Sequence, residues 1–456
     1  MKILLLFLII IHVYLWVLIL NASSKKRNFI ITGIMRISFL YDFILIIFPL
    51  FLYFIGIGDY SIQLRILFEI KFLLLGYLYH LIFLFSFLMF FKYFKFKECS
   101  YEKIQSNIPS IFVKFLQFIS IITTFIYVTM ALGFEFIGNP FFISVITIFW
   151  YSGFCFIVFL VYKSSSKKKI LNLFLLFACI LSLFIIAIKT GVRGRILWIP
   201  LLYIYIFLMT KQKILFSIKK LLIISLFIVL LIPSFYLFSF GEYRNDFANN
   251  IEFDELLSYL SNLMLDPKFL TEAFKNIFSI YVERSIGIIN NYFLSIQYDF
   301  LDFKFIKIYK GLFMLFIPSE IYSDKPILGS PGMLHDMAMY KSMIYYNLDG
   351  LMGSVLASGH AFWELGYFGL TVYPLFYVSI IYCITSIKLP YFPYFNILIA
   401  LIILGGLITD AFSTIFIPIY AILDIFFKSC LPLISLLFFI DFLLKPKKYS
   451  KKEYFK

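Results

Sequence analysis

The sequence predicts an all-α polytopic integral membrane protein with about 11–12 transmembrane helices, and three observations agree on this. Of the 456 residues, 62% are hydrophobic and only 14% are charged, whereas a soluble domain carries about 25% charged residues. Apolar runs of about 20 residues, the length that crosses ~30 Å of hydrocarbon, recur along the chain. Helices are required because lipid offers no hydrogen-bond partners to the backbone. The composition excludes a cytosolic enzyme, a disordered protein and a secreted module.

Eleven apolar segments are expected to span the membrane, and residues 411–426 could add a further short helix. The first segment has no small-residue cleavage site and is long enough to span, so we expect a helix rather than a signal peptide. The predicted spans lie near residues 3–20, 37–57, 72–91, 115–134, 141–162, 170–188, 196–210, 221–240, 361–386, 391–409 and 427–444.

Lysine-rich clusters occupy alternate loops and the C-terminal tail, which is the positive-inside pattern of a multi-pass membrane protein. The pattern predicts an external N-terminus and a cytoplasmic tail. No soluble basic domain is present, so no nucleic-acid partner is expected. The expected organisation is a bundle of about eight helices at 1–240, a large external loop with helical segments at 241–360, further membrane helices at 361–444 and a basic tail at 445–456.

The arginines run against this charge pattern. The chain has only seven, and five fall on the predicted external side: Arg65, Arg193, Arg195, Arg244 and Arg284. Because the guanidinium group binds phosphate in a bidentate manner, these positions indicate an anionic ligand at the outer membrane face. The alternative is that the arginines pair with loop acids such as Glu69, Glu242 or Glu283.

Three short motifs together resemble the O-antigen polysaccharide polymerase (Wzy) family over roughly residues 30–440. They are Thr190–Gly194 opening a span, Ile317-Pro318 followed by Asp324-Lys325-Pro326 in the large loop, and Glu364 with Gly366–Gly369 opening the next span. One departure is Ser319, where the family pattern has an arginine. If that arginine binds phosphate in the family, Arg284 or Lys325 must compensate here.

The resemblance implies polymerisation of undecaprenyl-pyrophosphate-linked oligosaccharide repeat units, for O-antigen, capsule or exopolysaccharide, at the outer face of the bacterial cytoplasmic (inner) membrane. It implies a metal-independent membrane glycosyltransferase of GT-C-like architecture without a cofactor. Donor and acceptor would both be lipid-linked glycans within membrane lipid, and chain-length regulator and flippase proteins are implied as further partners. The alternatives are a flippase or transporter of the same lipid-linked sugars and an O-antigen ligase-like enzyme.

The expected chemistry assigns candidate residues. Arginines can stabilise the charge that develops on departing lipid pyrophosphate, and a general base must accept the proton of the attacking hydroxyl. The favoured base is Glu364, expected at the outer end of a span where partial burial would raise its pKa. His360, Glu320 and Asp324 are the other candidates, although Glu364 could instead complement a helix dipole. The candidate substrate- and pyrophosphate-binding residues are Arg193, Arg195, Arg284, Lys325, Arg244 and Asp324.

Few ionisable residues lie inside the predicted spans. The clear cases are His12, Asp42, His80 and Asp441, and a transporter would need such groups along a hydrated path. We expect His12 and His80 to be hydrogen-bonded core residues. No group of ligands has metal-binding spacing along the sequence, so no metal is predicted, and no Walker spacing implies ATP.

The topology can be tested by thiol labelling of single-cysteine variants in a cysteine-free background. Ser330→Cys should react with an impermeant reagent in intact cells because the 241–360 loop is expected outside. Ser450→Cys should react only after permeabilisation. Labelling of Ser450→Cys in intact cells would contradict the 11-span model.

Overall fold

The computed structural model describes three continuous stretches and some isolated positions. Within them the regular elements are all helical, which confirms the all-α class for this part of the chain. Three helices are long and apolar enough to cross a membrane, over Ile3–Lys25, Leu73–Tyr93 and Gly366–Ser386. The described residues are 2–55, 70–99, 357–386, 118, 121–123, 125–126, 129, 268, 431, 434–435, 438–439 and 442. Of the external loop predicted at 241–360, the structure describes only Lys268 and residues 357–360, and the tail at 445–456 lies outside the described residues.

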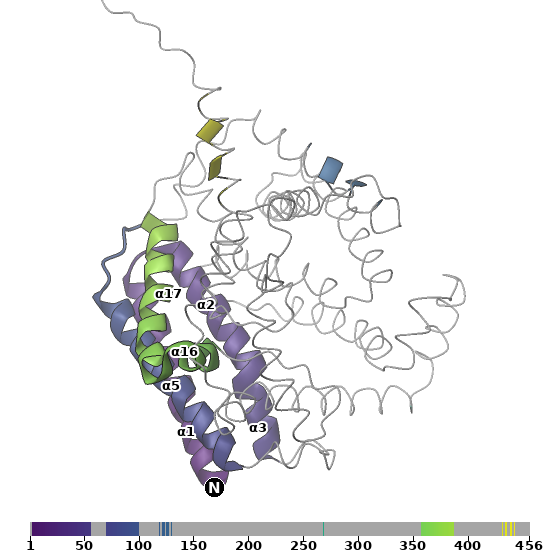
Figure 1. Cartoon of the computed structure of the whole chain (residues 1–456), viewed down its shortest axis with the longest axis vertical. Coiled ribbons are helices and arrows are strands. Elements are labelled where there is room, and N and C mark those ends of the chain that lie inside the picture. The colour runs from purple at the N-terminus through teal and green to yellow at the C-terminus, as the bar shows by residue number, and fades with distance from the viewer. Residues whose placement is uncertain are drawn as a thin grey trace, which may run out of the picture.

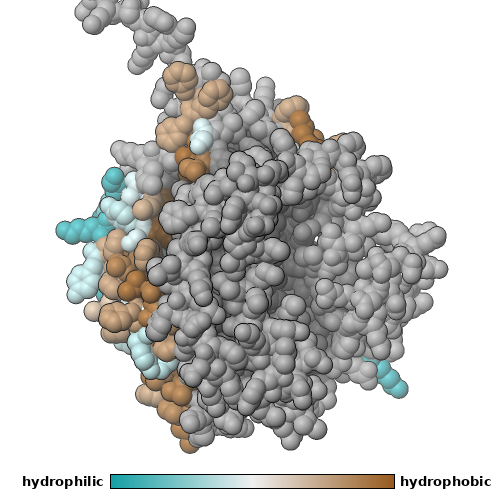
Figure 2. Space-filling view, viewed as in Figure 1, coloured by the Kyte–Doolittle hydropathy of each residue, from teal (hydrophilic) through white to brown (hydrophobic). Residues whose placement is uncertain are grey.

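Helix α1 (Lys2–Lys25) has one buried and one exposed face, although both are apolar. Its buried residues recur every three or four positions, as helical geometry requires for a single face. The exposed face carries large apolar side chains, among them Ile3, Phe7, Ile10 and Tyr14. Such a surface suits lipid rather than water. Figure 2 shows apolar side chains along the surface of the described helices.

The second predicted span was placed too late. It was expected at 37–57, but the helix begins at Phe29 and continues as α2 (Phe29–Asp42), the π-helical turn η1 (Phe43–Ile47) and α3 (Phe48–Phe54). Asn28 caps its start, because its side-chain oxygen accepts hydrogen bonds from the amides of Ile30 and Ile31. The wide turn accommodates Pro49, which has no amide hydrogen to donate into the preceding turn.

The long helices α1, α5 (Ile70–Tyr93) and α17 (Gly369–Ser386) run parallel to one another, and α2–α3 runs antiparallel to them (Figure 1). Residues near the ends of α1 and α5 are in contact, and so are residues near their middles. Tyr79 contacts Tyr367 and Phe94 contacts Tyr382, which sets α17 parallel to α5. This agrees with the predicted topology, in which five spans separate α5 from α17 and each span reverses the direction of the chain.

Two of the predicted basic clusters lie at the same end of this bundle, as their common cytoplasmic assignment requires. The Lys26 ammonium donates hydrogen bonds to the carbonyls of Lys92 (3.0 Å), in the last turn of α5, and Phe94 (2.7 Å), directly after it. Asn28 Nδ2 donates to the carbonyl of Lys97 at 2.8 Å. Burial lowers the pKa of Lys26, which lies over the rings of Phe91 and Phe96. The loop after α1 is therefore fastened to the loop after α5.

The span predicted at 361–386 is interrupted, which corrects the sequence interpretation. A short helix, α16 (Ala357–Leu365), is followed by a 3₁₀ turn, η3 (Gly366–Phe368), before α17 starts. Gly366 has φ +61°, a left-handed conformation that favours glycine. Gly369 lies so close to α16 that a Cβ atom there would collide with the carbonyl of Ala361. Glu364 therefore lies near the C-terminal end of α16 and not at the start of the spanning helix.

Helix α16 lies beside the interior of the bundle rather than at its end. The Phe362 ring stacks on the ring of Tyr79 with centroids 5.4 Å apart. Tyr79 lies six residues into the spanning part of α5, which corresponds to about 9 Å along a helix. In Figure 1, α16 crosses the bundle at the lower end of α17. The motif that carries Glu364 thus lies well inside the span of α5.

Replacing Gly369 tests how tightly the break is packed. Gly369→Ala should lower the free energy of unfolding in detergent by about 1–3 kcal/mol or more, because the new methyl group overlaps backbone. Gly366→Ala should cost about 1–2 kcal/mol through its left-handed φ. The matched control is Phe376→Leu, an apolar exchange at an exposed position of α17. Equal stability of Gly369→Ala and Phe376→Leu would contradict the described packing.

Candidate functional site: a buried histidine–aspartate cluster

The structure describes little of the site that was expected from the sequence. Glu364 and His360 both belong to α16, but their side chains are not among those described. The remaining predicted positions lie outside the described residues. They are Arg193, Arg195, Arg244, Arg284, Glu320, Asp324 and Lys325. These assignments therefore stay predictions.

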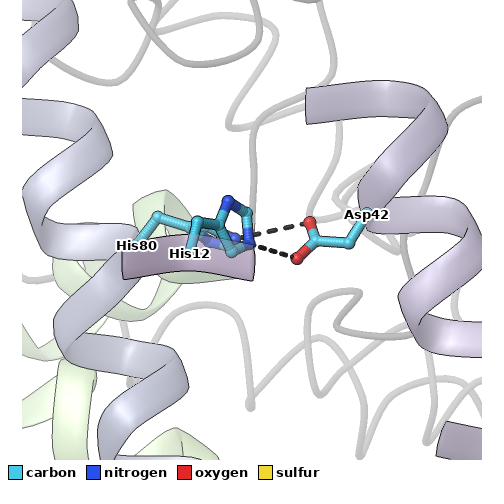
Figure 3. Close-up of side chains that lie close together, drawn as sticks. All are labelled: His12, Asp42 and His80. Atoms are coloured by element: carbon cyan, nitrogen blue, oxygen red, sulfur yellow. Dashed lines mark hydrogen bonds and ion pairs between the residues drawn. The ribbon is translucent and has the colours of Figure 1, made fainter. Parts of the chain in front are cut away.

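The described residues instead form a polar cluster inside the bundle. Its members are His12 of α1, Asp42 at the end of α2 and His80 of α5. Their side chains are 0%, 1% and 2% exposed, so the cluster is sealed from the surface. Figure 3 shows the two imidazole rings on one side and the Asp42 carboxylate facing them.

The Asp42 carboxylate is the centre of the cluster. Its Oδ2 lies 2.7 Å from Nε2 of His12 and accepts a hydrogen bond from the indole Nε1 of Trp16. Its Oδ1 lies 3.4 Å from Nε2 of His80, without the geometry of a hydrogen bond. Among the described residues, Oδ1 of Asp42 and Nε2 of His80 are thus buried without a hydrogen-bond partner.

Hydroxyl groups hold the opposite side of each imidazole. The Tyr77 hydroxyl lies 2.8 Å from Nδ1 of His12, and Oγ of Ser358 lies 3.4 Å from Nδ1 of His80. Both hydroxyl residues are buried, with side chains at most 3% exposed. These contacts orient both rings with Nε2 toward Asp42. Ser358 belongs to α16, so the cluster also reaches the helix that carries Glu364.

The register of the helices explains why these residues meet. His12 lies 14 residues before Lys26, Asp42 lies 14 residues after Asn28, and His80 lies 14 residues before Phe94. Lys26, Asn28 and Phe94 are tied together at one end of the bundle. Equal numbers of helical residues then bring the three polar side chains to the same depth.

A carboxylate at this depth needs compensation. Transfer of an ion into a low-dielectric interior costs several kcal/mol even after relaxation, and ionisable residues inside membrane helices commonly mark functional sites. The described contacts to Asp42 come from two imidazoles and one indole. None of these groups carries a fixed positive charge, so a proton on a histidine or a bound cation would complete the charge balance.

A second feature is a cluster of three aromatic side chains, Tyr79, Phe362 and Tyr367, at the break between α16 and α17. The Tyr79 and Tyr367 hydroxyls lie 3.1 Å apart, and the Phe362 ring is edge-on to Tyr367 with centroids 5.0 Å apart. Tyr367 is 68% exposed. The group therefore offers ring faces and a hydroxyl beside the motif of Glu364, a combination that can contact a sugar ring or a lipid chain.

The sequence interpretation identified the members of the cluster but not their meeting. His12 and His80 were expected to be hydrogen-bonded core residues. Burial of both is confirmed, whereas Nε2 of His80 has no hydrogen bond among the described atoms. The prediction of no metal depended on linear spacing, which cannot detect ligands from three helices. One feature of the sequence could have indicated that these residues meet. Each of the three lies 14 residues from a position at the basic end of the bundle.

Comparison with known proteins gives no relative from which a role could be transferred. No family model, no curated protein and no solved structure matches this chain.

Removing the indole donor tests whether Asp42 depends on it. Trp16→Phe keeps an aromatic ring but removes the Nε1 hydrogen bond to the carboxylate. Hydrogen bonds to charged groups contribute about 1.5–3 kcal/mol, so the free energy of unfolding in detergent should fall by that amount. The control is Tyr14→Phe, which removes a hydroxyl from an exposed residue of α1 and should change it by less than about 0.5 kcal/mol.

The decrease in the free energy of unfolding caused by Trp16→Phe should be smaller when it is measured in an Asp42→Asn background. The indole then bonds a neutral amide oxygen instead of a carboxylate, and neutral hydrogen bonds contribute only about 0.5–1.5 kcal/mol. An unchanged loss in that background would show that Trp16 acts by packing alone.

Proposed function

We propose that this chain is a membrane glycosyltransferase that polymerises undecaprenyl-pyrophosphate-linked oligosaccharide repeat units at the outer face of the bacterial cytoplasmic membrane. The proposal starts from the resemblance to the O-antigen polymerase family in three motifs. It is supported by the helical membrane architecture of the described part, where three helices have spanning length. The proposed overall architecture is GT-C-like and the proposed transfer is metal-independent.

The observation that carries the proposal is the broken helix at Gly366. The Glu364 and Gly366–Gly369 motif forms the junction between α16 and α17, beside the interior of α5. Irregular backbone at membrane depth is tolerated where it is buried in protein or lines a hydrated cavity. The exposed Tyr367 and Phe368 at this junction leave it accessible. A carboxylate on such an element can meet a substrate whose lipid stays in the membrane.

The proposed chemistry assigns two roles. Arg193, Arg195 and Arg284, with Arg244, Lys325 and Asp324 as further contacts, bind the pyrophosphate and stabilise its charge as it leaves the anomeric carbon. Glu364, or His360 one turn earlier in α16, accepts the proton of the attacking sugar hydroxyl. The products are a glycan lengthened by one repeat unit and free undecaprenyl pyrophosphate.

A second candidate function is transport of the same lipid-linked sugars, and the buried cluster favours it. Three of the four ionisable residues expected inside spans meet at one depth. Clusters of this kind serve as proton or ion relays in transporters, and broken helices form their binding sites. We rank this function second because the described groups around Asp42 seal the cluster from the surface.

The deciding experiment is polymerisation by the purified full-length chain in liposomes containing lipid-linked repeat units. Wild type should produce a ladder of longer lipid-linked chains. Glu364→Gln should slow elongation by a factor of about 10²–10⁴, the usual effect of removing a general base. Arg193→Ala should lose about a hundredfold, the usual effect of removing one donor to developing charge. The matched control is Glu98→Gln, which alters an exposed carboxylate in the loop after α5 and should leave the rate unchanged.

The outcomes separate the candidates. A Glu364→Gln rate within a few-fold of wild type, with a much slower His360→Ala, would assign the base to His360. If both variants stay fast, Asp324 or Glu320 becomes the candidate base. A wild-type chain that moves lipid-linked sugars between leaflets but never lengthens them would overturn the polymerase proposal in favour of transport.

A further inference from the structure

The two histidines of the buried cluster present the same nitrogen to the same carboxylate. Nε2 of His12 and Nε2 of His80 both face Asp42 (Figure 3), and one ligand atom from each of the three residues lies within 4.8 Å of the others. Each residue comes from a different helix, so the convergence is not a consequence of local sequence. Two imidazoles and one carboxylate are a donor set that first-row transition metals use in proteins.

Two separations between ligand atoms can be compared with those around a small ion. Ligand atoms bound to one tetrahedral Zn²⁺ at about 2.0–2.1 Å lie roughly 3.3 Å from one another. Nε2 of His80 and Oδ1 of Asp42 are 3.4 Å apart, close to that separation. Nε2 of His12 and Oδ2 of Asp42 are 2.7 Å apart. These two atoms would have to move about 0.6 Å further apart to reach the tetrahedral spacing around the ion.

The surrounding groups match the outer shell of a metal site. A metal-ligating histidine commonly donates its other ring N–H to a hydrogen-bond acceptor, which fixes the ring and the coordinating nitrogen. Here the Tyr77 hydroxyl lies at Nδ1 of His12 and the Ser358 hydroxyl at Nδ1 of His80. The Trp16 indole fixes the carboxylate through Oδ2. Each of the three ligand side chains therefore has a hydrogen-bonding neighbour from outside the cluster.

Two atoms of the cluster face each other at 3.4 Å without forming a hydrogen bond. Oδ1 of Asp42 and Nε2 of His80 are buried and have no hydrogen-bond partner among the described residues. Buried polar atoms without partners are rare in folded proteins and call for an explanation. A cation between them would satisfy both atoms. It would also compensate the Asp42 charge in the interior of the bundle.

We propose that His12, Asp42 and His80 bind one divalent first-row transition metal ion, best matched by Zn²⁺, which links α1, α2 and α5. Mg²⁺ and Ca²⁺ fit poorly because they prefer oxygen ligands. The three side chains leave a fourth coordination position. Because Ser358 orients His80, the bound ion also holds α16 in place against α5. The ion is structural: it does not contact the reacting groups of the proposed glycosyl transfer, and its binding does not depend on that function.

The test uses the full-length chain, purified in detergent without chelator and with any affinity tag removed. Elemental analysis of the wild type should find one transition-metal ion per chain. After treatment with a chelator the melting temperature should fall. Zn²⁺ should restore it at equimolar concentration, whereas Mg²⁺ should not. Asp42→Asn should lose the metal and the response to Zn²⁺, while the matched control Glu98→Gln should keep both.

Outer-shell variants separate coordination from simple packing. Tyr77→Phe keeps all three ligands and removes only the hydroxyl at Nδ1 of His12. It should still bind Zn²⁺ but with about 10–100-fold weaker affinity, as loss of such partners typically causes. The exposed Tyr14→Phe should bind with wild-type affinity.

Several results would overturn the proposal. One is a wild type without stoichiometric metal whose melting temperature does not respond to Zn²⁺, which would make the cluster a hydrogen-bonded network. Another is Zn²⁺ binding to Asp42→Asn with wild-type affinity. If Asp42→Asn fails to fold, Co²⁺ titration of the wild type decides. Ligand-field absorption of bound Co²⁺ that saturates at one equivalent supports the site, and its absence overturns it.

Discussion

The placement of one carboxylate, Asp42, inside an apolar helix bundle constrains the described part of this protein. A charge at that depth is costly unless polar partners meet it. The partners come from α1 and α5 and include His12, Trp16 and His80. The hydroxyl groups of Tyr77 and Ser358 in turn orient the two imidazoles. Four helices must therefore keep a fixed relative position for this one group to be accommodated.

Contacts at the basic end of the bundle hold α1, α2 and α5 in this fixed relative position. The chain turns after α1 at Lys25–Arg27, and this turn is bound to the loop after α5 through Lys26, Asn28 and Cys99. Because helices rise a constant distance per residue, contacts between their ends also fix the relative depth of residues further along each helix. The lysines that orient a membrane protein during insertion thus include one, Lys26, that also fastens two helices together in the folded state.

The break at Gly366 links this cluster to the proposed chemistry. Helix α16 rests on α5 through Phe362 and reaches His80 through Ser358, and it carries Glu364 in the same short segment. A change in the cluster would therefore be transmitted to the position of α16. Both candidate functions require such an element, since polymerisation needs a positioned base and transport needs a discontinuous helix at the substrate.

The sequence by itself determined the helical membrane class of the described part and the relative direction of its three long helices. Long apolar runs predicted α1 and α5 to within a few residues, and the lysine pattern predicted that α1, α5 and α17 run parallel. These features could be predicted because hydropathy and topogenic charge act locally, on one segment against one membrane. The early start of the second helix was missed because Arg36 interrupts its apolar run, although Asn28 was an available capping signal.

Only the tertiary structure decided where the helix of residues 357–386 breaks and which polar residues meet. The segment around Gly366–Gly369 is apolar enough to continue a span, yet the helix breaks at Gly366 and Gly369 packs closely against Ala361. His12, Asp42 and His80 are isolated along the sequence, where none has a ligand neighbour. Their convergence requires packing of three helices in one register, and it is a long-range property that no single segment encodes.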